Sequence, residues 1–232
     1  MAEIFVYLKT FFVSQLLARG ACMFNVCPGC GEYTDAKEII NPPGRAICTI
    51  CGYERQFLSL PLFVITGASG SGKTTVALEL VAGSNDFVVL DQDILWNDAF
   101  NEPVNDYQFF RNTWLRMVKN INQAGKPVVL IGSATPEQYE SCVERRYISR
   151  IHYLALVVEP AELERRLIAR PGWRKSGSPE NLERMLDFNN WLFENASKTE
   201  PKMTLLDTSL ITLQETVKSV QDWLRERISG VR

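Results

Sequence analysis

The sequence lacks an excess of charge of either sign, because 25 Lys and Arg residues stand against 27 Asp and Glu residues and give a formal net charge of −2. Such a chain has no general electrostatic field with which to hold a polyanion. Nucleic acid is therefore a disfavoured partner, and any phosphate must be bound by a local group of residues. Hydrophobic residues at 46% and charged residues at 22% also exclude a wholly disordered or collagen-like chain.

The sequence also lacks an apolar run of the ~20 residues that a membrane-spanning helix needs. The apolar stretch from Ile4 to Ala18 is interrupted by Lys9. Glu3 before it and Arg19 after it are unlike the basic start and the small-residue cleavage site of a signal peptide. We interpret residues 1–22 as an N-terminal extension, either a loose or a packed helix, with translation from Met23 as a further alternative, and expect a cytoplasmic protein with no membrane segment.

From residue 60 onward, short continuous apolar runs alternate with segments of helical spacing. Continuous apolar runs are typical of parallel strands that helices cover on both faces. The alternation predicts an α/β domain over residues 60–232, with a five-stranded, doubly wound parallel sheet and the P-loop NTPase fold. The expected strands are Leu62 to Thr66, Phe87 to Asp91, Pro127 to Gly132, Ile151 to Val158 and Met203 to Asp207.

The segments between these runs have the spacing of amphipathic helices. Apolar residues recur every three or four positions over 107–121 and again over 213–228. Thr135 and Gln138 predict a capping box, with Pro136 at the first helical position. These signals place helices between the strands, as a doubly wound sheet requires.

A glycine-rich stretch follows the first expected strand and leads into a helix. Residues 67–74 fit the pattern G-x-x-x-x-G-K-[ST] at every fixed position. Glycines let backbone N–H groups surround phosphate oxygens, and the positive end of the following helix faces the anion. Lys73 is expected to reach the β- and γ-phosphates, and Thr74 to ligate Mg²⁺. The residues predicted to bind ATP here are Gly67, Ala68, Ser69, Gly70, Ser71, Gly72, Lys73, Thr74 and Thr75.

Two carboxylates follow the second expected strand. Asp91 and Asp93 flank Gln92, and alternation along the strand places both carboxylates on one side. The carboxyl ends of parallel strands meet at the crevice that holds the ligand. One carboxylate can bind Mg²⁺ while the other takes the proton of an attacking hydroxyl, and we assign the metal to Asp91 and the base to Asp93. The alternative is that one or both cap the following helix.

The glycine loop with its Lys-Thr pair, the D-x-D after the second strand and a later R-L-x-x-R together resemble the nucleoside, shikimate and gluconate kinase group. The resemblance covers residues 60 to 230 and implies transfer of the ATP γ-phosphate to a hydroxyl. In that group, arginines after the fourth strand belong to a mobile lid over ATP. By this resemblance Arg166, Arg170 and Arg174 contact ATP, although Arg166 has the alternative of lying on a solvated helix face. The catalytic residues are then Lys73, Asp93 and Arg170.

The third expected strand departs from a common NTPase pattern, because it ends in Gly132-Ser133 without an aspartate. This departure disfavours a motor ATPase. It also leaves Mg²⁺ to Thr74, Asp91 and water.

The acceptor is less well specified than the nucleotide. Aromatic side chains could stack on a nucleoside base, but aromatic residues at helical spacing are also common in cores. Asn189 and Asn190 could contact the polar edges of such a base, whereas His152 is interpreted as a core residue. We expect a small-molecule hydroxyl acceptor and favour a nucleoside. The aromatic candidates are Trp96, Trp114, Trp173, Phe188 and Trp191.

Four cysteines predict a zinc ribbon over residues 23–58. Cys27, Cys30, Cys48 and Cys51 form two C-x-x-C pairs with 17 residues between them. Four thiolates fill a tetrahedral Zn²⁺ site and leave no position for water, so the site is expected to be structural. Disulfides or a redox pair are the alternatives, and the doubled motif disfavours both. The ribbon has no basic excess, so docking on the kinase domain or on a protein partner is expected in preference to nucleic acid.

Three functions remain open from the sequence. The first is a small-molecule kinase that uses ATP, Mg²⁺ and a structural Zn²⁺. The second is a polynucleotide end kinase, which has the same loop and carboxylates but needs a basic channel. The third is a non-catalytic switch in which ATP binding changes how the ribbon engages a partner.

Overall fold

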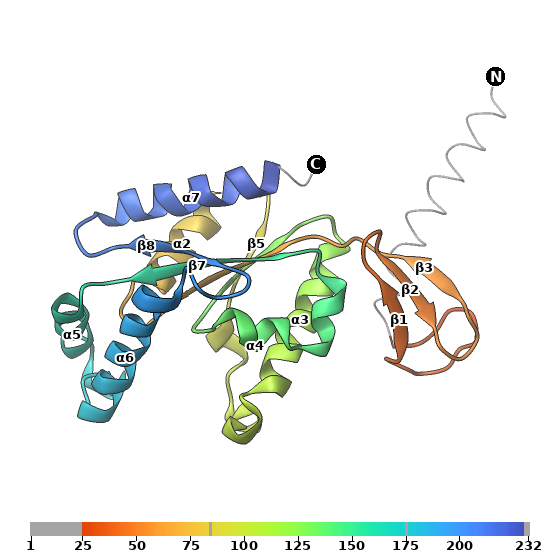
Figure 1. The fold of residues 1–232 in the computed structure, drawn as a ribbon, viewed down its shortest axis with the longest axis horizontal. Helices are drawn as coiled ribbons and strands as arrows, with labels where there is room; N and C mark the ends of the chain where they lie inside the picture. The colour runs from red at the N-terminus through yellow and green to blue at the C-terminus, as the bar shows by residue number, and fades with distance from the viewer. Residues whose placement is uncertain (1–24, 84, 175, 230–232) are drawn as a thin grey trace.

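The computed structural model describes residues 25–83, 85–174 and 176–229, which form a small antiparallel sheet followed by a larger parallel sheet (Figure 1). The predicted N-terminal extension, residues 1–22, lies outside the described residues. Within the described residues, no helix has the length and apolar character needed to cross a membrane.

The small sheet consists of β1 (Lys37–Ile40), β2 (Arg45–Cys48) and β3 (Glu54–Gln56), paired antiparallel in that order. Its buried apolar cluster contains Ala46, Phe57 and the partly buried Ile39, together with Tyr147 from the larger domain. Three short strands with so few buried side chains gain little from apolar burial. The small sheet therefore depends on stabilisation beyond its own core, which is consistent with the metal site predicted from its cysteines.

The larger sheet confirms the predicted α/β class and all five strands. It consists of β4 (Leu62–Gly67), β5 (Val88–Asp91), β6 (Val128–Ile131), β7 (Ile151–Val157) and β8 (Met203–Asp207). Their order is β5-β6-β4-β7-β8, and every pair is parallel. The observed ends differ from the predicted ends by at most one residue. All carboxyl ends consequently lie along one edge of the sheet.

Helices and 3₁₀ turns connect the strands. The α-helices are α2 (Lys73–Gly83), α3 (Gln108–Asn122), α4 (Pro136–Glu140), α5 (Pro160–Ile168), α6 (Pro179–Asn195) and α7 (Leu213–Ser229). The 3₁₀ turns are η2 (Gln92–Leu95), η3 (Asp98–Phe100), η4 (Pro103–Asn105), η5 (Val143–Tyr147) and η6 (Gly172–Arg174). The predicted capping box is present, since Gln138 Oε1 accepts a hydrogen bond from Thr135 N–H at 3.0 Å.

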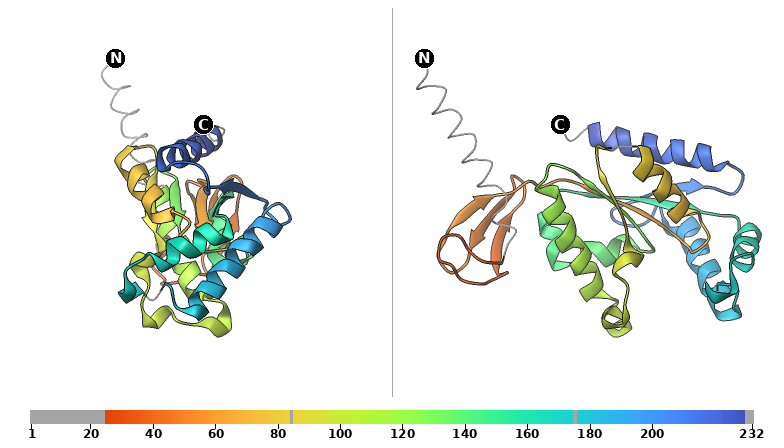
Figure 2. Two further views of the ribbon diagram at one scale, coloured as in Figure 1. Left: turned by 90° about the vertical axis from the view of Figure 1, so that its left-hand side faces the viewer. Right: turned by 180° about the vertical axis from the view of Figure 1, so that it is seen from behind.

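The core of the larger domain lies on both faces of the sheet. Leu62 and Val64 pack in one cluster with residues of α3, α4 and α6, whereas Phe63 and Ile65 pack in another with residues of α2 and α7. These two groups of helices cover opposite faces of the sheet (Figure 2). None of these four side chains is exposed. The continuous apolar run in β4 follows from this arrangement, because a strand covered on both faces has no solvent side.

The small sheet contacts the larger domain through η5 and α3. The rings of Phe57 and Tyr147 lie 5.4 Å apart, and Arg146 Nη1 donates to Lys37 O at 3.0 Å. Gln123 at the end of α3 exchanges two hydrogen bonds with the backbone of Leu58, of 2.9 and 3.1 Å. These contacts fix the small sheet on the side of the molecule away from α5 and α6 (Figure 1).

Candidate functional site

The glycine-rich loop lies between the carboxyl end of β4 and the first turn of α2, as predicted. Gly70 and Gly72 have φ values of 92° and 97°, in the region that residues with a Cβ rarely adopt. At Gly67 a Cβ would approach Leu156 O to 2.5 Å. The loop therefore needs glycine at these positions both for its conformation and for its close packing on β7.

Lys73 begins α2 and turns back over the loop. Its Nζ donates to Gly67 O at 2.7 Å and to Ala68 O at 2.9 Å. The pKa of Lys73 is lowered to about 8, and burial is the largest cause. The negative charge of Asp93 raises this pKa, the positive charge of Arg170 lowers it, and the negative charge of Asp91 raises it. These three charged side chains thus lie close enough to Lys73 to influence its titration.

The two aspartates lie at the carboxyl edge of the sheet. Asp91 ends β5, and its Oδ1 accepts a hydrogen bond from Asp93 N–H at 2.9 Å, so it caps the 3₁₀ turn η2. The Asp93 side chain is exposed. Gln92 between them is buried on the opposite side, where its Nε2 donates to Tyr139 OH at 2.6 Å. The capping alternative therefore holds for Asp91. Strand alternation does not extend to Asp93, because β5 ends at Asp91 and Asp93 lies in η2.

The three arginines carried over from the kinase resemblance lie in different surroundings. Arg170 Nη1 donates to Ser69 Oγ at 2.6 Å, which brings it onto the glycine loop. Arg166 instead pairs with Glu162 at 2.8 Å and donates to Thr208 O at 3.3 Å. Arg174 ends η6, and its side chain lies outside the described part of the structure. Among the described guanidinium groups of this set, Arg170 is the one that contacts the loop.

Thr74 and Thr75 occupy the first turn of α2 and are exposed. Ser71, in the loop before them, is buried, and its Oγ has no hydrogen-bond partner among the described residues. An unpaired hydroxyl inside a loop of this type is consistent with a site built for an additional polar group.

Two contacts to the loop were not foreseen from the sequence. Ser133, just after β6, donates from Oγ to Gly67 O at 2.9 Å. The thioether of Met185 in α6 lies 3.3 Å from the N–H of Ser69. The position of Ser133 directly after an expected strand could have predicted that it lies near the loop. The sequence carried no such signal for Met185, which lies 116 residues away.

The aromatic and amide residues considered for acceptor binding separate into core and surface groups. Trp114 is fully buried, as the core alternative supposed, whereas Trp96 and Trp173 are 49% and 77% exposed. Asn189 is also fully buried, and its amide exchanges hydrogen bonds of 3.1 and 2.7 Å with the backbone of Val158. The suggestion that Asn189 contacts an acceptor is therefore wrong, because its amide already holds the end of β7.

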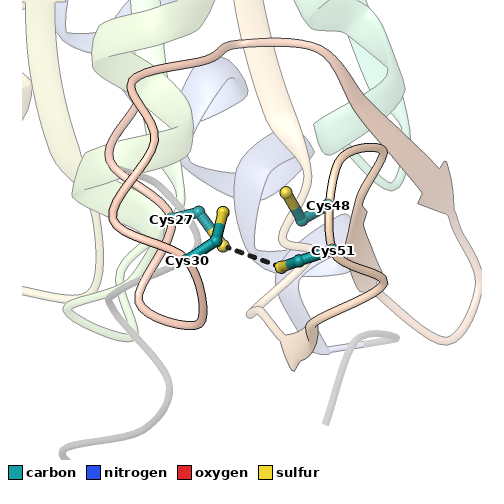
Figure 3. Close-up of side chains that lie close together, drawn as sticks. All are labelled: Cys27, Cys30, Cys48 and Cys51. Carbon is teal, nitrogen blue, oxygen red and sulfur yellow. Dashed lines mark hydrogen bonds between the residues drawn. The ribbon is translucent and has the colours of Figure 1, made fainter.

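The four cysteines of the small sheet converge on one point (Figure 3). All four Sγ atoms lie within 4.8 Å of one another, and those of Cys27 and Cys51 are 3.7 Å apart. Tetrahedral coordination with Zn–S bonds of ~2.3 Å places sulfur atoms ~3.8 Å apart. The donor set and its spacing therefore fit Zn²⁺.

Backbone N–H groups also favour the thiolate form of one cysteine in this cluster. The N–H group of Cys30, followed by that of Gly29, lowers the pKa of Cys27 to about 6 against the opposing effect of burial. Gly31 and Gly52, which follow the two pairs, have φ values of 76° and 73°. These glycines allow the tight turns that direct N–H groups toward sulfur.

We expect Cys27→Ser to lose the metal from a protein that otherwise holds about one zinc ion per chain. The small sheet should unfold with the loss, because little apolar burial remains to hold it. Metal analysis by mass spectrometry of the purified variant checks this. Cys142→Ser is the matched control, since Cys142 is a buried cysteine outside the cluster and its replacement should leave the zinc in place. Full zinc retention by Cys27→Ser would contradict the assignment.

Comparisons with known proteins agree with this geometry. A family model described as an AAA domain matches residues 62–193, more than half of the chain. Among solved structures, the chain is similar to a sugar kinase from Janibacter sp., with a TM-score of 0.54 and 19% identity, over 72% of this chain and 95% of that one. At this identity the similarity shows a shared P-loop kinase-like fold, not a shared substrate.

Two further solved structures have a TM-score of 0.48. A gluconokinase from Sinorhizobium meliloti is 20% identical over 74% of this chain and 95% of its own. The tunicamycin resistance protein of Deinococcus radiodurans is 18% identical over 72% and 95%. No curated protein matches the chain.

Proposed function

The chain belongs to the AAA domain family that matches residues 62–193. We propose that it is an ATP-dependent kinase that phosphorylates a hydroxyl of a small metabolite. The observation that carries the proposal is the grouping of Lys73, Asp91, Asp93 and Arg170 around one glycine loop. Phosphoryl transfer needs cations at the phosphates and a carboxylate at the nucleophile, and this group supplies both.

Each of these side chains takes one role in the proposal. Lys73 exchanges its two loop carbonyls for β- and γ-phosphate oxygens when ATP binds. Arg170 holds the phosphates from the lid side, because its guanidinium already contacts Ser69. Asp93, exposed at the carboxyl edge, orients the acceptor hydroxyl and takes its proton.

The metal that belongs to this reaction is Mg²⁺. Thr74, in the first turn of α2, and Asp91, at the end of β5, would hold it directly or through water. When bound, Mg²⁺ neutralises charge on the transferred phosphate. Asp91 would keep its capping contact with Asp93 N–H through Oδ1 and offer its other oxygen to the ion.

A nucleoside is the acceptor that we favour. Trp96, next to η2, is half exposed, and its ring lies 5.7 Å from that of Tyr107 and 5.3 Å from that of Phe110. Trp173 is exposed in η6. Trp96, at the end of the turn that contains the proposed base, offers stacking area for a flat ring.

In this proposal the ribbon, residues 23–58, is held by structural Zn²⁺ and serves as a docking module for a protein partner, while residues 60–232 form the kinase domain. The protein is expected to act in the cytoplasm, where thiolates remain available for zinc.

The proposal is tested by measuring ADP formation with ATP, Mg²⁺ and a panel of nucleosides, sugars and sugar acids, with oligonucleotide 5′ ends included as a separate arm. We expect ADP release that depends on one class of small acceptor. ADP release that depends only on oligonucleotides would replace the proposal with an end kinase. ATP binding without acceptor-dependent ADP release would replace it with a switch.

The lowered pKa of Lys73 predicts a pH dependence of ATP affinity. The ammonium form neutralises phosphate, and in the free protein it is lost as the pH rises through about 8. Above that pH, ATP binding must take up a proton, so the affinity should fall by up to about tenfold per pH unit. Calorimetric titration across this range checks the slope. Lys73→Arg should abolish this fall in ATP affinity, because a guanidinium stays charged. If the Lys73→Arg variant still loses affinity above about pH 8, the proton belongs to another group.

A further inference from the structure

A cleft of about 640 Å³ opens at the edge of the large sheet opposite to the glycine loop. Its lining includes His152 at the start of β7 and Thr204 at the start of β8. Because all strands of this sheet are parallel, the starts of β7 and β8 lie at the edge away from the carboxyl end of β4. The cleft is therefore separate from the proposed nucleotide site.

The side chains around this cleft carry more positive than negative charge. Its charged lining residues are Arg145, Arg150, Lys202, Arg227, Glu140 and Glu200. Arg145 and Glu140 form an ion pair at 2.6 Å and offset one another. Three cations then remain against one carboxylate. Within the described residues, neither Arg150 nor Lys202 makes an ion pair.

The carboxylates lie toward one side of the cleft. Glu140 and Glu200 also line an adjoining hollow of about 390 Å³. Arg150, Lys202 and Arg227 do not line that hollow. These three cations therefore line the cleft alone, whereas the two carboxylates are shared with the hollow.

His152 lines the cleft together with two of the guanidinium groups, those of Arg150 and Arg227. Its ring stacks on Phe63 with centroids 5.2 Å apart. Burial, the charge of Arg227 and the charge of Arg150, in that order of size, together lower the pKa of His152 to about 4. At neutral pH the cleft therefore holds an uncharged imidazole near two cations, and that imidazole can donate or accept a hydrogen bond.

Arg227 is held in place by its own helix. Its Nη1 donates to Trp223 O at 3.0 Å, and its guanidinium lies over the Trp223 ring at 4.8 Å from the centroid. Its acidic neighbour Glu226 lies 3.3 Å away and is 75% exposed, so this pair contributes little in water. A positioned guanidinium with weak compensation is suited to a charge-assisted contact with an anion.

We propose that this cleft is a second ligand site, which binds a small dianion, a phosphate monoester or a dicarboxylate, between Arg150 and Arg227. Lys202 adds a third positive charge, and His152 and Thr204 provide uncharged hydrogen-bonding groups. The volume is in the range of small-molecule sites. Guanidinium forks match the paired oxygens of both anion classes.

The chain offers a reporter for this site, because His152 is its single histidine. We would follow the ring protons of His152 by NMR while adding inorganic phosphate, and separately malonate, at constant ionic strength. A saturable shift is expected with at least one anion, together with a rise in the His152 pKa, since a bound anion offsets the nearby guanidinium charges. Which anion binds tighter separates the phosphate from the dicarboxylate class. No saturable shift with either anion would overturn the proposal.

Matched variants locate the binding. Arg150→Gln removes an exposed, unpaired cation and should weaken binding by about tenfold or more. Glu200→Gln should tighten binding by removing the opposing carboxylate. Arg225→Gln, on the same helix as Arg227 but outside the cleft lining, should leave it unchanged. A shift that survives Arg150→Gln but disappears in Lys73→Ala would place the anion at the glycine loop and refute the second site.

Discussion

Lys73→Ala is expected to lower the rate of phosphoryl transfer by a factor of about 10² to 10³ or more, the range for removal of a positioned charge that stabilises the transition state. The fold should not suffer. Burial lowers the pKa of Lys73 to about 8, so at neutral pH the folded protein holds an ammonium that is less favourable there than in the unfolded chain. Removing it relieves that cost, and the melting temperature should stay the same or rise.

The measurement is the rate of acceptor-dependent ADP release, read beside the melting curve of the same preparation. Lys126→Ala is the matched control, because Lys126 is an exposed lysine in the turn before β6. Its rate should equal that of the parent protein. An unchanged rate in Lys73→Ala would mean that the glycine loop does not hold the reacting phosphate. A rate lost together with the fold would show that the two hydrogen bonds from Lys73 to the loop carbonyls support structure.

The strands of the large sheet were predictable because they are covered on both faces. Leu62, Phe63, Val64 and Ile65 are all fully buried, and so the run is apolar without interruption. The ends of such an apolar run mark the ends of the strand, and β4 extends only one residue beyond the predicted end. The order of the strands was not predictable, since parallel pairing joins residues far apart, as in Leu62 with Ile151.

The residues of the candidate site were predictable where they belong to a local sequence motif. They were not predictable where tertiary contacts determine their position. The glycine loop, Lys73 and the aspartate pair lie within short motifs, and the structure brings them together. Arg166 and Arg170 share one motif, yet the structure gives them different partners, Glu162 for the first and Ser69 for the second. Their spacing in the motif cannot distinguish them, because Arg166 lies on α5 and Arg170 lies beyond its end, and their partners depend on where Glu162 and the loop lie in space.

The amide of Asn189 shows a further limit of sequence reasoning. Its place among aromatic residues suggested a surface for ligand contact, but both of its hydrogen-bonding groups hold the backbone of Val158. An asparagine that is buried and bonded to the backbone at the end of a strand cannot be told from the sequence alone from an asparagine that contacts a ligand. The distinction requires its partners to be known.

Asp93→Asn is expected to lower kcat by a factor on the order of 10² to 10⁴, the usual contribution of a general base. The amide keeps the shape of the carboxylate but cannot take the proton of the acceptor hydroxyl. ATP affinity should change little, since the loop, Lys73 and Thr74 are untouched. Measurement of kcat with saturating acceptor, beside a calorimetric titration with ATP, separates the two effects.

Asp91→Asn is the matched partner of this experiment. The asparagine Oδ1 can still accept the hydrogen bond from Asp93 N–H, so η2 should keep its cap and any change in activity reflects the lost charge. Loss of a metal ligand should raise the Mg²⁺ requirement and be partly restored by more Mg²⁺. If Asp91→Asn stays inactive at every Mg²⁺ concentration while Asp93→Asn remains within a few-fold of the parent, the roles of the two aspartates are reversed. If neither substitution alters turnover, the carboxylate edge takes no part in the reaction. If neither substitution has an effect and no acceptor is ever phosphorylated, ATP binding without transfer becomes the better account of the site.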